Sequence, residues 1–163
     1  MRLWRYGIVS LIVAALVASG AAFYSIIQKR GLAEVHVLVI RNTDSGRVYG
    51  KWALHDAGEF AIEFIHSVNQ SPVREFYRIE GGLVRPLAVR FASFGAGMQS
   101  DLEDGLILSR EGDALLISGF NTAYKELNYI VGTVSDHLLI INDEQFSLQE
   151  LCGRNAHITI HIE

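Results

Sequence analysis

A histidine and a glutamate are the first residues whose types and spacing suggest chemistry. His66 ends an alternating apolar segment, a polar loop follows, and Glu75 lies in the extended segment that Pro72 begins. If residues 59–66 and 72–79 form a hairpin, we expect His66 and Glu75 to meet across it, where the carboxylate would orient the imidazole and raise its pKa. The sequence leaves three interpretations open: a structural pair, a ligand-binding site and a catalytic pair.

Ser67 directly follows His66 and is the nearest candidate nucleophile. Neighbouring residues on a strand point to opposite faces, so His66 is badly placed to activate it. Ser67 also lacks the flanking glycines of a Gly-x-Ser-x-Gly elbow. We therefore predict no catalytic residue here.

A glycine-containing stretch provides the second candidate, Ser93-Phe94-Gly95-Ala96-Gly97-Met98. Glycines permit positive φ and close backbone approach, so exposed N–H groups could form an anion-binding nest. No Lys-Ser/Thr pair follows, so the stretch is not a phosphate loop. The alternative is a tight connection packed by Phe94 and Met98. In a meander, this stretch would return to the same end of the domain as His66, whichever of the two roles it has.

Metal sites and cofactors are not expected from this sequence. The acidic run around Asp101 and Asp104 lacks the twelve-residue calcium pattern. His157 and His161 would be about 13 Å apart on a strand, too far to share an ion. Cys152 is the single cysteine, which rules out an internal disulfide and a cysteine-pair zinc site and suggests a small buried residue.

The elements that must position these residues are strands, because apolar residues alternate with a period of two from Val35 onward. Clusters of Gly, Asp and Asn separate the alternating runs and predict turns. Pro86 suggests an edge strand or a bulge. The predicted strands are the run from Val35 to before Asn42, Arg47–Leu54, 59–66, 72–79, Leu83–Ala92, Gly105–Ser109, Ala114–Ser118, Lys125–Val131, His137–Ile141 and Ile158–Ile162.

Short strands at this spacing predict an all-β domain, a small antiparallel sandwich or barrel, and the sequence does not choose between the two. A helical turn is expected only around Ser147–Leu151. We therefore divide the chain into residues 1–30, a transmembrane or signal helix, and residues 31–163, one β domain.

The N-terminal part contains 21 uncharged residues, Gly7–Ile27. As a helix this run spans about 30 Å, the thickness of a bilayer's hydrocarbon core. Basic residues flank it on both sides, so the positive-inside rule does not set the orientation. A short basic tail before a signal-like segment favours a cytoplasmic N-terminus, which places the β domain outside the cytoplasm. We expect an uncleaved anchor, with cleavage near Ala18-Ser19-Gly20 as the alternative.

Charge is distributed unevenly along the chain. From residue 31 onward there are ten basic and eighteen acidic residues, a balance of −8. An acidic domain repels phosphate backbones, so nucleic acid is excluded as a partner.

The two candidate stretches together form a wider pattern: His66-Ser67-Val68, Pro72-Val73, Glu75, Tyr77 and Ser93-Phe94-Gly95-Ala96-Gly97-Met98. This pattern resembles a bacterial family of small extracytoplasmic proteins classed as a domain of unknown function, over residues 34–163. Family members have an N-terminal signal or anchor and one β-rich domain. Their genes often lie beside the membrane component of TAXI-type TRAP (tripartite ATP-independent periplasmic) transporters.

The resemblance implies an accessory role near such a transporter, with its membrane subunit or its binding protein as partner, and it supplies no catalytic residues. We therefore expect a non-enzymatic, membrane-anchored protein. A small-ligand or ion-binding β module is the alternative. The candidate binding residues are His66, Ser67, Glu75, Tyr77, Ser93, Phe94, Gly95 and Gly97.

Overall fold

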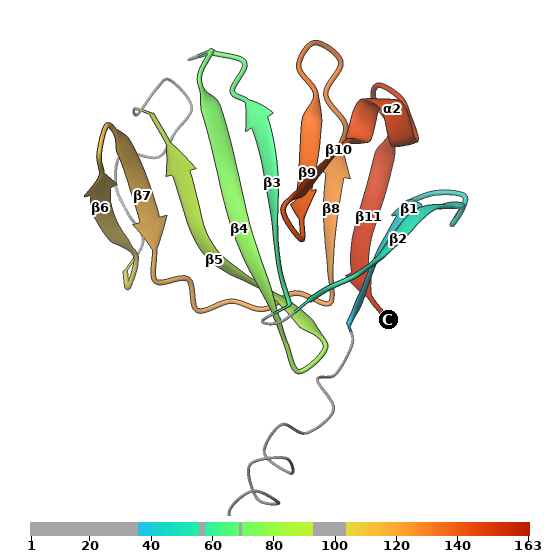
Figure 1. Cartoon of the computed structure of the whole chain (residues 1–163), viewed down its shortest axis with the longest axis horizontal. Coiled ribbons are helices and arrows are strands. Elements are labelled where there is room, and N and C mark those ends of the chain that lie inside the picture. The colour runs from blue at the N-terminus through green and yellow to red at the C-terminus, as the bar shows by residue number, and fades with distance from the viewer. Residues whose placement is uncertain (1–35, 56–57, 69, 93–103) are drawn as a thin grey trace, which may run out of the picture. The chain divides into compact units, whose positions relative to one another are not determined.

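Eleven antiparallel strands and one short helix make up the described part of the chain, residues 36–55, 58–68, 70–92 and 104–163 of a computed structural model (Figure 1). A small sheet contains, in spatial order, β2 (Val48–Ala53), β1 (Val37–Asn42), β11 (His157–Ile162) and β8 (Glu126–Ile130). A large sheet contains β10 (Glu144–Ser147), β9 (His137–Ile141), β3 (Glu59–Ile65), β4 (Pro72–Glu80), β5 (Leu83–Phe91), β7 (Ala114–Ser118) and β6 (Ile107–Glu111).

The two sheets pack face to face around one core. Its buried side chains come from both sheets and include Leu38, Ile40, Ile158 and Ile160 of the small sheet and Phe60, Ile62, Leu139 and Ile141 of the large one. Alternation along each strand produces this arrangement, because every second side chain points to the same face. The prediction of an all-β antiparallel fold is confirmed, and the two separate sheets make it a sandwich.

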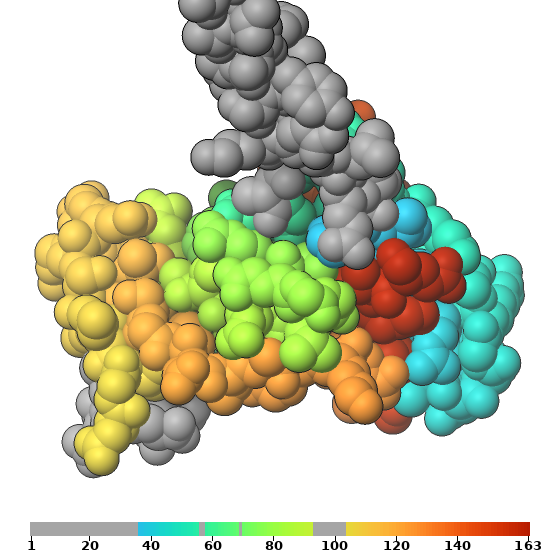
Figure 2. All heavy atoms as spheres, turned by 90° about the horizontal axis from the view of Figure 1, so that it is seen from below, coloured from blue at the N-terminus to red at the C-terminus, as the bar shows by residue number. Residues whose placement is uncertain are grey.

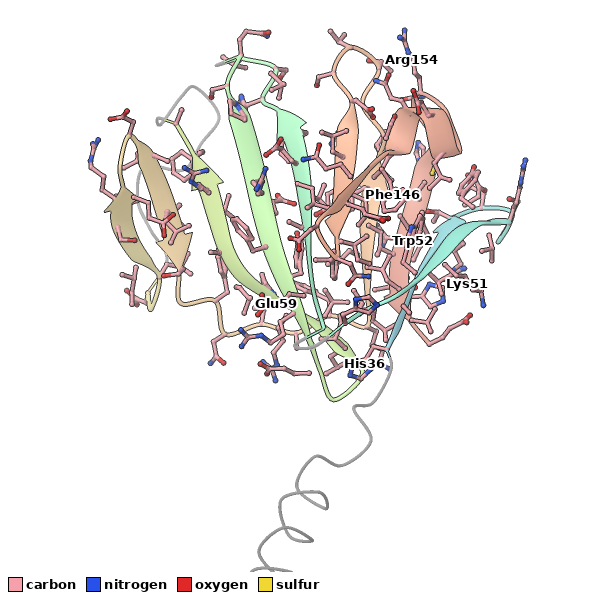
Figure 3. The ribbon with its side chains drawn as sticks, in the orientation of Figure 1. His36, Lys51, Trp52, Glu59, Phe146 and Arg154 are labelled. Carbon is pink, nitrogen blue, oxygen red and sulfur yellow. The ribbon has the colours of Figure 1, made fainter. Side chains whose placement is uncertain are left out.

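Two corners connect the sheets. At one corner the ring centroids of Trp52 on β2 and Phe146 on β10 lie 5.3 Å apart, and the two side chains point toward one another in Figure 3. At the other corner the connection from β7 to β8 runs along the β4–β5 hairpin (orange and green in Figure 2), where Val84 and Tyr124 exchange backbone hydrogen bonds. At this second corner the chain passes from the large sheet to the small one.

Strand β10 was not predicted from the sequence. It pairs with β9 through a tight turn in which Asn142 and Asp143 have φ of 50° and 64°. Positive φ at both central residues is typical of the two-residue hairpin turns that favour Asn and Asp. The helical turn that was expected near this point is α2 (Leu148–Cys152), and the Ser147 side chain accepts a hydrogen bond from the Glu150 N–H as its N-cap.

A β-bulge interrupts the pairing of β4 with β5. Phe76 pairs with Ala88, whereas Tyr77 pairs with Pro86, so Leu87 is an extra residue on β5. The bulge expected from Pro86 is therefore present, and β5 is an inner strand with β4 and β7 as neighbours.

The uncharged run Gly7–Ile27 lies outside the described residues. No helix in the described part of the chain is both long and apolar enough to cross a bilayer.

Candidate functional site

The core-facing side of β4 contains a carboxylate. Along this strand Val73, Tyr77 and Ile79 are 5%, 8% and 5% exposed, and Glu75 lies between them on the same side. A carboxylate turned toward a core requires hydrogen-bond donors, because an unpartnered charge there is costly. Glu75 is therefore the point from which we describe the site.

Two tyrosines supply those donors. The Tyr77 hydroxyl donates to Glu75 Oε2 at 3.0 Å, and the Tyr129 hydroxyl donates to the same oxygen at 2.5 Å. The two hydroxyl oxygens lie 2.7 Å from each other. Tyr77 comes from the large sheet and Tyr129 from β8 of the small sheet, so this polar contact joins the two layers.

The three oxygens form a triangle with a limited number of protons. Each tyrosine has one hydroxyl proton, and an ionised carboxylate has none. With Glu75 ionised, two of the three contacts can be hydrogen bonds at any instant. The triangle therefore has unused acceptor capacity, which a third donor could occupy.

Burial raises the pKa of both tyrosines, and the neighbouring Glu75 charge raises them further. Both phenols therefore stay protonated around neutral pH. Protonated phenols are hydrogen-bond donors and poor nucleophiles, which suits them to binding rather than to covalent chemistry.

His137, the first residue of β9, adjoins this triangle. Its ring stacks on Phe64 with centroids 4.9 Å apart and meets the Tyr129 ring edge-on at 6.3 Å. Its Nδ1 accepts a hydrogen bond from the Gly132 N–H at 3.0 Å, so the neutral ring carries its proton on Nε2. Burial lowers the pKa of His137, while the charges of Asp136 and Glu75 act in the opposite direction. We call Glu75, Tyr77, Tyr129 and His137 the Glu75 cluster.

The turn before His137 requires a glycine for steric reasons. A Cβ on Gly132 would lie 2.1 Å from the Ser135 carbonyl oxygen and 3.3 Å from His137 Nδ1. Any side chain at this position would displace the backbone donor that holds the imidazole. Gly132 thus fixes the orientation of His137.

The structure does not bring His66 and Glu75 together. Within the β3–β4 hairpin, Ile62 pairs with Glu75, and the His66 backbone bonds to Ser71 and Gln70 in the turn. Four residues along a strand separate Ser71 from Glu75, about 13 Å. The predicted hairpin is present, but the prediction that His66 and Glu75 meet across it is wrong, because the turn sets a register that places them apart.

The remaining predicted residues have different outcomes. His66 Nδ1 accepts a hydrogen bond from the Val68 N–H at 3.3 Å, and the Ser67 carbonyl accepts one from the Gln70 side chain, so both residues belong to the turn. Glu75 and Tyr77 do lie together. Ser93, Phe94, Gly95 and Gly97 lie outside the described residues.

Tyr129 and His137 were missed from the sequence, although both lie in predicted strands. Tyr129 is 52 residues from Tyr77, so nothing local links the two. A polar side chain at an apolar position of an alternating strand is a signal that could have marked Tyr129 on β8. His137 precedes four apolar residues that do not alternate, so the sequence offered no such signal for it.

Metal and thiol chemistry have little support in the described residues. Among them, no three side chains of His, Cys, Asp or Glu come close enough to hold a metal ion. Cys152, expected to be buried, is only half buried, and desolvation raises its pKa to about 11. A thiol with a raised pKa is a weak nucleophile at neutral pH.

Fold and site together define an antiparallel β-sandwich with a carboxylate–tyrosine–histidine cluster between its sheets. The family described as a domain of unknown function (DUF1850) matches residues 60–148, which run from β3 to the start of α2 and include the whole Glu75 cluster. The chain belongs to this family. No curated protein and no solved structure matches it.

Proposed function

We propose that the chain is a non-enzymatic accessory protein that Gly7–Ile27 anchors in the membrane, with its β-sandwich outside the cytoplasm and beside a TRAP-type transporter. The observation that carries this proposal is the short connection between the anchor and the sandwich. Nine residues, 28–36, lie between Ile27 and the start of β1 at Val37. Even fully extended, they reach about 35 Å, so the sandwich stays near the bilayer surface.

This position suits contact with the extracytoplasmic loops of a membrane subunit, or with a binding protein that docks on one. The resemblance described above supports a TAXI-type transporter as the neighbour. The Glu75 cluster is compatible with a binding role, because its tyrosines are protonated donors.

Co-purification of the full-length chain from its native membranes tests the proposal. A C-terminally tagged protein, cross-linked in cells and extracted in mild detergent, should enrich the transporter's membrane subunit or binding protein in mass spectrometry. As a control, an unrelated uncharged segment of equal length replaces Gly7–Ile27, and enrichment should persist because the sandwich makes the contact. Equal recovery with a tagged protein that has the same anchor and an unrelated β domain would contradict the proposal.

Topology is tested separately. A reporter fused after Glu163 should be active only if it functions outside the cytoplasm. Activity of a cytoplasm-specific reporter at that position would reverse the proposed orientation.

The second candidate function is a small-ligand or ion-binding module centred on Glu75 and Tyr77. The observation that favours it is the convergence of two hydroxyls on one carboxylate oxygen. A bound ligand should raise the thermal midpoint of the protein, and Tyr129→Phe should reduce that rise. A ligand whose stabilising effect is unchanged in Tyr129→Phe binds elsewhere.

A further inference from the structure

The small sheet covers only part of the large sheet. At one of its edges, Trp52 of β2 packs against Phe146 of β10. At its other edge, Tyr129 of β8 contacts Tyr77 of β4. The small sheet therefore lies mainly over β10, β9, β3 and β4. Strands β5, β7 and β6 continue the large sheet beyond β4, on the side away from β8 and β11 (Figure 1).

One row of paired residues crosses the large sheet on its inner side. From the covered part outward, this row is Leu139, Ile62, Glu75, Val89, Ile117 and Leu108. Leu139 and Ile62 are fully buried, whereas Leu108 is 41% exposed and the residues between them are partly exposed. We call Val89, Ile117 and Leu108 the apolar strip. Glu75 thus lies where the covered core ends and the apolar strip begins.

Glu75 has no cationic partner in the described part of the chain. On the outer side of the same sheet, Glu59 and Glu63 each form an ion pair with an arginine. Glu75 has the two tyrosine hydroxyls instead, and both donate to its Oε2. Its Oε1 accepts no hydrogen bond from the described residues. One carboxylate oxygen and one negative charge are therefore available to a ligand.

The two tyrosines prepare this carboxylate for a ligand. Their hydroxyls hold Oε2, so the orientation of Glu75 is set before anything binds to Oε1. A group that is already oriented loses less conformational freedom on binding. The phenols are neutral and bring no positive charge, so a cation is the complement that this site lacks.

We propose that Glu75 and the apolar strip bind a small amphipathic cation, an ammonium group on an apolar chain. The ammonium donates to Glu75 Oε1, and the chain lies along Val89 and Ile117. Two strand spacings, about 10 Å, separate Glu75 from Ile117, so a short alkyl chain is long enough. A hydrogen bond between two charged groups is stronger than one between neutral groups. The inference rests on the second candidate function, a ligand-binding module, and gives the class of its ligand.

Four small compounds test the inference on the full-length chain in a non-ionic detergent. Hexylamine is the probe, because an alkylamine is a cation at neutral pH, like the lysine side chain. Hexanol has the same chain without the charge, and ethylamine has the charge with a shorter chain. Hexanoate has the opposite charge, and it is included because Arg110 pairs with Leu115 in the next row of the same side.

The thermal midpoint of the protein, recorded against the concentration of each compound, gives the four dissociation constants. Hexylamine should bind about tenfold more tightly than each of the other three. Glu75→Gln keeps the size of the side chain and removes its charge. It should weaken hexylamine binding about tenfold and leave hexanol binding unchanged, a difference that a general loss of stability does not produce.

A matched pair of variants locates the alkyl chain. Ile117→Thr replaces an apolar side chain of the strip and should weaken hexylamine binding about threefold. Ile107→Thr makes the same exchange at a 60% exposed residue next to Leu108, which points to the other face of β6. It should bind hexylamine like the unmodified protein. Circular dichroism checks that each variant is folded, and this pair serves as the test if Glu75→Gln does not fold.

The inference is overturned if hexanol, hexanoate or ethylamine binds as tightly as hexylamine, or if none of the four binds. Equal hexylamine affinities of Ile117→Thr and Ile107→Thr, or of Glu75→Gln and the unmodified protein, would also overturn it. If hexanol or hexanoate binds as tightly as hexylamine and Tyr129→Phe weakens that binding, the ligand-binding function stands and only the cationic ligand is wrong. Binding that both Tyr129→Phe and Glu75→Gln leave unchanged would contradict the ligand-binding function as well.

Discussion

The two sides of β4 carry charge in different ways. On the core-facing side, Glu75 receives hydrogen bonds from two tyrosine hydroxyls whose pKa is raised by burial. On the outer side, Arg74 and Arg78 form ion pairs with glutamates of β3 in partly exposed positions. Residues that are neighbours in the sequence thus have partners of different chemistry.

Solvent explains this difference. Between the sheets a charge depends on fixed donors, because a position turned toward the core is less open to solvent than the outer surface. At the surface an ion pair contributes little, since water competes for both partners. The inner contacts are therefore expected to contribute more to the free energy of unfolding than the outer ion pairs. The predictions below test this on the fragment 32–163, which should be soluble and give a β-type circular dichroism spectrum once Gly7–Ile27 is removed.

Deletion of Leu87 should have the largest effect. Without the extra residue, the segment of β5 before the bulge changes faces, which exposes Val84 and turns Arg85 toward the core. We expect a loss of about 4 kcal/mol or more in the free energy of unfolding, measured by urea denaturation. Leu87→Ala keeps the bulge and should cost only about 1 kcal/mol. If deletion of Leu87 and Leu87→Ala lowered the free energy of unfolding equally, the bulge would not be what places the residues of β5 on their faces.

Truncation of Tyr129 should come second. Tyr129→Ala removes a half-buried ring that packs against the core, as well as a donor to Glu75, and should lower the free energy of unfolding by about 3 kcal/mol. Tyr129→Phe removes the hydroxyl alone and should cost about 1 kcal/mol. Urea denaturation measures both. A Tyr129→Phe protein as stable as the parent would mean that the hydroxyl contact does not join the sheets.

The pH dependence of the free energy of unfolding should show the effect of protonating His137. Burial lowers the pKa of His137 in the folded protein, so the unfolded chain binds a proton more readily. Neutral His137 therefore makes its full contribution to the free energy of unfolding above the ordinary histidine pKa of about 6.5. That contribution is lost as the pH falls below this value. His137→Asn, which keeps an acceptor for the Gly132 N–H, should show a shallower loss between neutral and mildly acidic pH. Parallel pH profiles of parent and variant would contradict this.

Removal of an outer ion pair should have the smallest effect. Arg74→Gln breaks the contact with Glu63 at a position that solvent reaches, so the free energy of unfolding should change by about 0.5 kcal/mol or less. Urea denaturation again provides the measurement. A loss as large as that of Tyr129→Ala would remove the distinction between the two sides of β4.

The alternation of apolar residues, together with the turn residues between the runs, predicted all the described strands except β10. Ten strands were expected from the sequence, and each has a counterpart in the structure. A strand is visible in the sequence because its side chains point to alternate faces, which gives the apolar residues a period of two. Glu75 and Tyr77 were placed on one face for the same reason, two residues apart on one strand. β10 was missed because its four residues do not show an alternating apolar pattern of their own.

Other features depended on contacts distant in the sequence. The turn between β3 and β4 set the register that separates His66 from Glu75, and local periodicity does not specify that register. Tyr129 reaches Glu75 only because β8 packs across β4 from the other sheet. The sequence by itself determined the strands, their faces and the motifs that indicate the family. Only the tertiary structure decided which polar residues meet, because strand register and sheet packing depend on the whole chain.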